Sequence, residues 1–103
     1  MKLLTKELIR TIPKLYAQDE KGLEAIAYIK FFDSWGSWKW FATEFDGEDT
    51  FFGYVVGSFP ELGYFSLSQL KSLGWRIERD RFFTPTTLSK LMIQYEQEGS
   101  NVA

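Results

Sequence analysis

The chain has 103 residues, a formal net charge of −2, and neither cysteine nor histidine. Its length corresponds to a single domain. The missing residue types exclude disulfides, Cys-ligated metal sites, and catalysis that depends on a thiolate or an imidazole. Acidic and basic residues nearly balance, so no broad electrostatic attraction to nucleic acid or to an anionic membrane is expected.

Apolar content points to a globular protein with interaction surfaces. Aromatic residues make up 18% of the chain, more than a core of this size needs, so some rings are expected at the surface. No stretch approaches the ~18 apolar residues of a membrane span. Lys6 and Glu7 interrupt the apolar opening that a signal peptide would need. We therefore expect a cytoplasmic protein without a membrane partner.

The first elements are predicted to be a helix and a strand. Thr5 is a good N-cap for a helix over residues 5–12, which Pro13 would end. Residues 24–32 are predicted to form a strand with apolar side chains on both faces, which is typical of a central strand. A turn over residues 33–37 follows.

Residues 38–57 are the most distinctive stretch, and they predict a β-hairpin. Strands are expected over 38–45 and 50–56, with the hairpin pair Asp46-Gly47 between them. Strict alternation would place Trp38, Trp40, Ala42 and Glu44 on one face, and Lys39, Phe41, Thr43 and Phe45 on the other.

The remaining elements complete an antiparallel meander. Strands are predicted over 62–65 and, at the edge of the sheet, over 75–79. Between them Ser66 starts a short helix with a capping box, directs Leu67, Leu70 and Leu73 inward, and Gly74 ends it. The last helix is predicted with Thr84 as N-cap, Pro85 at the first position and Gly99 at its end.

These elements predict the fold class. We expect an α+β fold, with a four- to five-stranded antiparallel meander sheet and short N-terminal, middle and C-terminal helices. A single domain over residues 1–99 is predicted, followed by a frayed tail over residues 100–103.

Three groups of residues have functional potential. The carboxylates Glu44, Asp46, Glu48 and Asp49 crowd the hairpin turn, where they can keep the turn solvated, contact a partner or hold a divalent cation. The aromatic residues are candidates for core packing, a protein-facing patch or a base-stacking platform, namely Trp35, Trp38, Trp40, Tyr54 and Tyr64. The last group comprises Arg76, Arg79 and Arg81, interleaved with acids in a pattern that surface ion pairs explain, with a site for a phosphate or an acidic partner as the alternative.

Several stretches resemble the bacterial family known as domain of unknown function 2958. They include residues 3–9 (LLTKELI), 25–32 (AIAYIKFF), 40–49 (WFATEFDGED), 52–57 (FGYVVG), 61–67 (ELGYFSL) and 77–80 (IERD). The resemblance covers roughly residues 1–92. It implies a setting on phages, plasmids or integrative elements, beside genes that counter host defence, and it transfers no catalytic residue.

Together these observations predict a small non-enzymatic binding module of a mobile element. We expect a protein partner, such as a defence nuclease that the module inhibits, and either a monomer or a homodimer. The expected contact residues are Trp38, Trp40, Glu44, Asp46, Glu48 and Asp49, without a cofactor or metal. The alternatives are a single-stranded nucleic-acid-binding accessory protein, which the charge disfavours, and a metal-dependent hydrolase that uses the acidic hairpin.

Overall fold

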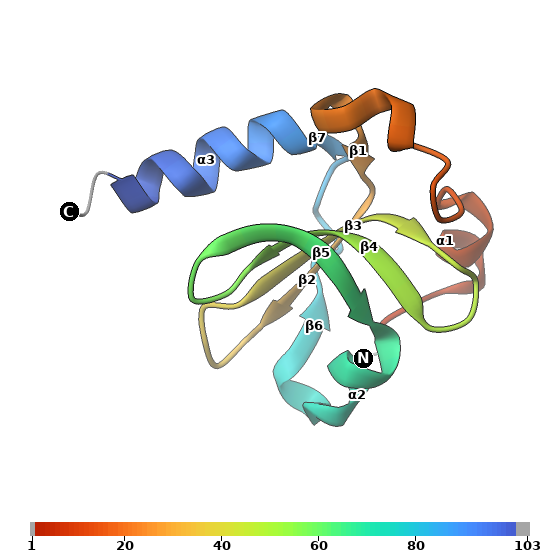
Figure 1. Ribbon diagram of the computed structural model, residues 1–103. Helices are drawn as coiled ribbons and strands as arrows, with labels where there is room; N and C mark the ends of the chain where they lie inside the picture. Colours follow the sequence, from red (N-terminus) through yellow and green to blue (C-terminus); the bar gives the residue numbers. More distant parts are fainter. Residues whose placement is uncertain (1, 101–103) are drawn as a thin grey trace.

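Residues 2–100 are described by a computed structural model (Figure 1), with side chains described for residues 2–96. The centre is a five-stranded antiparallel sheet in the order β5-β4-β3-β2-β6. Its strands are β2 (Ile29–Asp33), β3 (Lys39–Phe45), β4 (Thr50–Val56), β5 (Pro60–Ser66) and β6 (Ile77–Arg79). The predicted α+β class and the meander are confirmed, with β6 at the edge beside β2.

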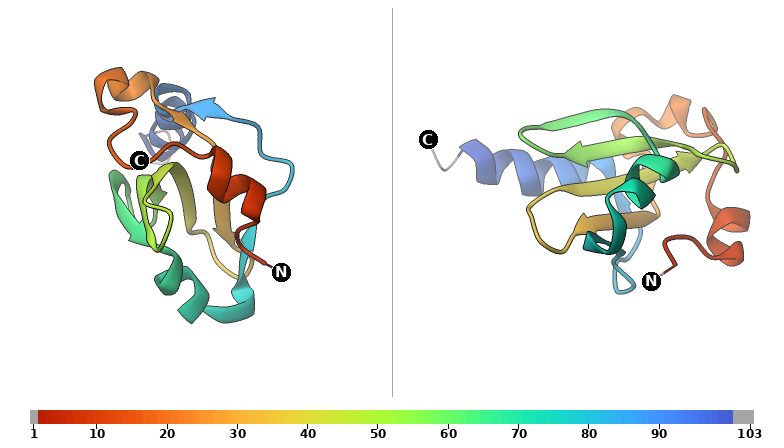
Figure 2. Two further views of the ribbon diagram at one scale, coloured as in Figure 1. Left: turned by 90° about the vertical axis from the view of Figure 1, so that its right-hand side faces the viewer. Right: turned by 90° about the horizontal axis from the view of Figure 1, so that it is seen from below.

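Helices lie on both sides of this sheet. They are α1 (Lys6–Thr11), α2 (Leu67–Ser72), α3 (Leu88–Ser100) and two 3₁₀-helices, η1 (Asp19–Glu24) and η2 (Gly74–Arg76). The end of α3 and the helix α1 lie at opposite ends of the molecule (Figure 2). No helix within residues 2–100 is long and apolar enough to cross a bilayer.

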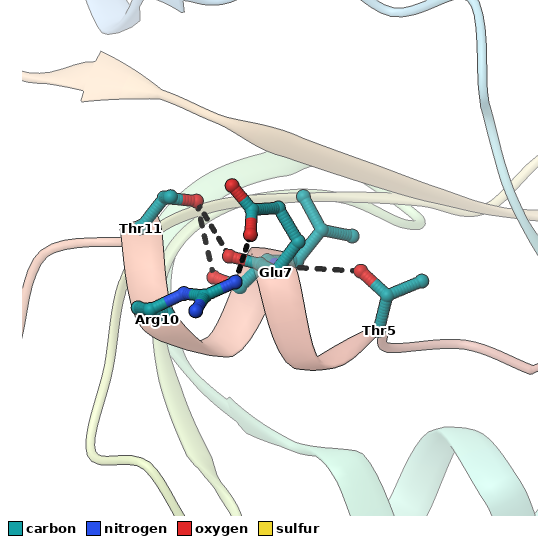
Figure 3. Close-up of polar contacts among 5 residues, drawn as sticks. Thr5, Glu7, Arg10 and Thr11 are labelled. Carbon is teal, nitrogen blue, oxygen red and sulfur yellow. Dashed lines mark hydrogen bonds and ion pairs between the residues drawn. The ribbon is translucent and has the colours of Figure 1, made fainter.

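Local capping confirms two of the three predicted helix starts, Thr5 and Ser66. Thr5 Oγ1 accepts the N–H of Leu8 at 3.1 Å, and Arg10 pairs with Glu7 one turn earlier in α1 (Figure 3). At α2, the side chain of Ser66 accepts the N–H of Gln69, and the Gln69 side chain accepts the N–H of Ser66. Each cap satisfies main-chain N–H groups that the first helical turn leaves without a partner.

The predicted strand 24–32 is two strands rather than one. It breaks at Tyr28 into β1 (Ile26–Ala27) and β2, and β1 pairs with β7 (Thr86–Thr87) in a separate two-stranded sheet. Ala27 consequently packs in a different core from Ile29 and Phe31. The break lets one continuous apolar segment serve both sides of the main sheet.

The main sheet separates two hydrophobic cores. One side carries the rings of Phe45, Phe51 and Phe65, stacked at centroid distances of 4.3 and 5.0 Å, and is covered by the N-terminal segment and by Leu70 of α2. On the other side Phe41 and Tyr54 pack beneath Leu88 and Leu91 of α3, together with Ala25 and Ala27. Each face of the sheet is therefore anchored by aromatic rings.

A β-bulge in β3 overturns the strict alternation predicted for residues 38–45. The register to β4 shifts between Ala42 and Glu44, so one extra residue is inserted. Phe45 therefore joins Trp40 and Ala42 in the same core, instead of facing the opposite side.

The predicted limits of the last helix were wrong. Thr84 and Pro85 precede β7, and α3 begins only at Leu88, where the Thr87 hydroxyl accepts the N–H of Lys90 at 3.3 Å. Pairing with β1 holds residues 86–87 extended. Gly99 does not end the helix, which continues to Ser100; of the predicted tail, residues 101–103 lie outside the described residues.

Candidate partner-binding site

The acidic turn is organised by bonds to its own main chain. Asp46 Oδ1 accepts the N–H groups of Glu48, Asp49 and Thr50 at 2.8, 2.8 and 3.0 Å. These bonds, that of Glu48 first, hold the pKa of the Asp46 carboxyl below its usual value. Asp49 accepts the N–H and the hydroxyl of Ser68 and thereby ties the turn to α2. Two of the four predicted contact carboxylates thus stabilise the fold.

Glu44 lies in the interior, which corrects its prediction as an accessible contact residue. Its side chain is 3% exposed, and its two carboxylate oxygens accept the N–H groups of Tyr16 at 2.9 Å and Gln18 at 2.7 Å. The Gln18 side chain in turn bonds the carbonyls of Thr43 and Ile26. The β3 bulge points Glu44 into this network, which holds Tyr16 at a φ of +73°, a conformation that non-glycine residues rarely adopt.

The predicted contact residues do not form one surface. Trp38 and Trp40 lie at the start of β3 and the acidic turn at its end, which are about 20 Å apart at ~3.3 Å per residue. Trp40 is buried in the core, whereas Trp38 remains 43% exposed. Nor do the arginines gather, because Arg76 pairs with Asp33 at 2.6 Å while Arg79 donates to the carbonyls of Lys2 and Leu3.

Trp38 and Trp40 instead help to line a groove between β5 and the end of α2, here named the β5–α2 groove. Its volume is about 460 Å³. Its lining comprises Trp38, Trp40, Val55, Glu61, Gly63, Tyr64, Phe65, Gln69, Leu70, Ser72 and Leu73. Leu73 is 44% exposed rather than turned inward as predicted. Apolar side chains and polar groups both line this groove, and binding sites combine the two.

Gly63 is the sequence signal that marks this groove. It lies in the middle of β5, where glycine weakens a strand, and a Cβ atom built there would meet nothing within 4 Å. Gly53, opposite it on β4, differs, because a Cβ there would lie 1.8 Å from the carbonyl oxygen of Phe41. Internal packing therefore explains Gly53, whereas Gly63 leaves open space that belongs to the groove.

A second apolar surface borders β5 on the opposite face of the sheet. Tyr64 and Leu62 are exposed there, and the Tyr64 ring packs edge-on against Phe52 at 5.0 Å. A hydrogen bond with the Tyr16 side chain raises the pKa of Tyr64. A hollow of about 270 Å³ beside them is lined by residues that include Leu23, Phe52 and Leu62. Apolar surface thus flanks β5 on both sides.

Among residues 2–96, whose side chains the structure describes, no group of three or more acidic side chains is placed to hold a metal ion. In the comparison with protein families, residues 3–102 match the family described as "Protein of unknown function (DUF2958)". The chain belongs to this family. No curated protein and no solved structure matches the chain.

Proposed function

We propose that this member of the DUF2958 family is a small, non-enzymatic binding module that attaches to a protein partner through the β5–α2 groove. The observation that carries the proposal is the groove itself, where the exposed ring of Trp38 and the buried rings of Trp40 and Phe65 border an open space beside the edge strand β5. Tryptophan and tyrosine residues in such positions supply most of the binding energy in many protein interfaces. Trp38 is the central anchor of this proposed surface.

The charge of the groove favours a protein over nucleic acid. Glu61 is the only residue of its lining that is charged at neutral pH. Binding of a phosphate backbone depends on lysine and arginine along the path of the strand. A carboxylate in that position would repel the backbone, whereas a polypeptide can present an apolar side chain and a cation together.

The proposal extends to the class of partner. The resemblance described above implies a phage, plasmid or integrative element beside genes that counter host defence. We therefore propose that the partner is a host protein or one encoded by the element, with a defence nuclease that the module inhibits as the leading class. Small size and a surface groove bordered by Trp38 suit a protein that acts by covering another protein's surface.

The test is capture of partners from the native host lysate, with and without nuclease, by the tagged chain. Gly63→Val should fill the groove yet keep the free energy of unfolding within about 0.5 kcal/mol, because its side chain enters open space and valine suits strands. Trp38→Ala should weaken capture by about 2 kcal/mol or more, roughly 30-fold. Both variants should therefore lose a partner that the wild-type chain retains.

Phe82→Ala is the matched control, because Phe82 is 90% exposed and does not line the groove. It should capture the partner as the wild-type chain does. Capture that Gly63→Val and Trp38→Ala leave unchanged contradicts the groove as the contact surface. Partners that disappear on nuclease treatment contradict the protein-binding proposal and favour nucleic acid.

A further inference from the structure

The main chain of β5 has hydrogen-bonding groups that point away from the sheet. The N–H of Leu67 donates to the carbonyl of Asp49 at 2.8 Å, in the same register as the β4–β5 pairs. Since hydrogen-bonding direction alternates along an antiparallel strand, Glu61, Gly63 and Phe65 face β4. The N–H and C=O groups of Leu62 and Tyr64 therefore point outward, at the free edge.

The two edges of the sheet differ in how they are protected. At one edge, β6 has only three residues and carries the charged Glu78 and Arg79, which are features that prevent strand pairing. At the other edge, β5 has seven residues, and Glu61 is its only charged one. Length and low charge leave β5 open to a further strand.

The β5–α2 groove reaches this open edge. Tyr64 belongs to the groove lining, although its ring lies against Phe52 on the opposite face, so its main chain is what the groove exposes. Figure 1 shows α2 directly after β5, where the chain turns away from the sheet edge. An edge strand beside a helix is the arrangement into which extended peptides add as strands.

We propose that the partner enters as an extended segment that adds to the sheet along β5 and pairs with the main chains of Leu62 and Tyr64. This inference rests on the proposed function and specifies how the partner is recognised. Alternate side chains of the added strand lie on opposite faces. One set enters the groove against Trp38 and Leu73, and the other set covers Leu62 and Tyr64 on the opposite face.

Charge selects the chemistry of the segment. Since Glu61 faces the groove without a cationic neighbour in the lining, a lysine or arginine of the segment complements it. The residues next to that cation along the same face are apolar, because the side chains of Trp38, Val55 and Leu73 line the groove there. The segment is therefore extended, with a basic residue among bulky apolar ones.

The experiment uses linear peptides enriched from a phage-displayed random library on the immobilised whole chain. Amide hydrogen exchange of the ¹⁵N-labelled chain is then measured with and without the most enriched peptide. In the free chain the Leu62 and Tyr64 amides should exchange roughly 100-fold faster than those of Gly63 and Phe65. The peptide should slow the first pair at least about tenfold and leave the second pair unchanged.

Two variants separate main-chain pairing from side-chain contact. Leu62→Pro removes an N–H group that is not bonded to any strand of the sheet, and edge strands tolerate proline at such positions. Leu62→Ala removes the side chain but keeps that N–H group. Binding of the peptide should fall at least about tenfold further in Leu62→Pro than in Leu62→Ala. Enriched peptides should carry lysine or arginine, and Glu61→Lys should abolish their binding.

Three results overturn strand addition. The first is a peptide that the Gly63→Val variant fails to bind, while in the wild-type chain with the peptide bound the Leu62 and Tyr64 amides exchange as fast as in the free chain. The second is equal binding by Leu62→Pro and Leu62→Ala, and the third is a library that yields no binder. All three leave the proposed function standing if lysate capture still depends on Trp38, whereas loss of that dependence removes the proposed function itself.

Discussion

Replacing Glu44 with alanine should destabilise the protein strongly without touching its exposed surface. The carboxylate is buried and accepts two main-chain N–H groups, those of Tyr16 and Gln18. Removing it leaves both donors in the interior without a partner. The segment that carries Tyr16 at its positive φ thereby loses both of its bonds to the Glu44 carboxylate of β3.

The size of the effect follows from these two bonds. A hydrogen bond to a charged acceptor contributes about 1.5–3 kcal/mol, and a buried donor without a partner costs a similar amount. Glu44→Ala should therefore lower the free energy of unfolding by about 3–5 kcal/mol. For a domain of this size that corresponds to a fall in Tm of roughly 15–25 °C. Glu44→Gln keeps one acceptor and should show about half the effect.

Urea unfolding followed by tryptophan fluorescence and far-UV circular dichroism measures this difference. Glu48→Ala is the matched control, because Glu48 belongs to the same acidic stretch but is exposed. It should change the free energy of unfolding by less than about 0.5 kcal/mol. A loss below about 1 kcal/mol for Glu44→Ala would refute the structural role assigned to the carboxylate.

Two further predictions concern the sheet and its edge. Gly53→Ala should destabilise the protein by about 3 kcal/mol in urea unfolding, because its Cβ would overlap the Phe41 carbonyl. Gly63→Ala, whose Cβ enters open space, should leave the stability unchanged. Equal stability of the two variants would contradict this packing. The hydrogen bond from Arg76 holds the pKa of the Asp33 carboxyl below its usual value. The ion pair therefore stabilises the folded state at pH values above the pKa of an unfolded aspartate, which is ~3.9. This stabilisation is lost as the pH falls through the lower pKa that Asp33 has in the folded state. Thermal melting between about pH 5 and pH 2 should therefore show a steeper fall in Tm for the wild-type chain than for Asp33→Asn, and parallel curves would contradict the assignment.

Local chemistry explains most of what could be predicted. The strand Thr50–Val56 was predicted with its observed limits, because aromatic and β-branched residues fill the stretch between a turn pair and a glycine. Thr5 and Ser66 were identified as helix caps because their hydroxyls act on N–H groups only three residues away. Such interactions are complete within one short stretch of chain, so the sequence displays them directly.

The candidate site could be predicted only in part. Trp38 and Trp40 do line the β5–α2 groove, but Glu44, Asp46 and Asp49 hold main-chain groups of the fold. Composition alone made all four acids of the turn appear equivalent. Glu61 was not predicted as a contact residue, and Leu73 was predicted to point inward, because both become neighbours of Trp38 only after β5 and α2 have folded against the sheet.

The sequence by itself determined the α+β class, the antiparallel meander and the helix caps Thr5 and Ser66, since each depends on periodicity or on contacts within a few residues. Tertiary structure alone decided the bulge that turns Glu44 inward, the pairing of Thr86–Thr87 with Ile26–Ala27, and the groove beside β5. These features depend on partners far away along the chain. The free energy of such contacts is gained only when distant segments meet, so no local pattern records it.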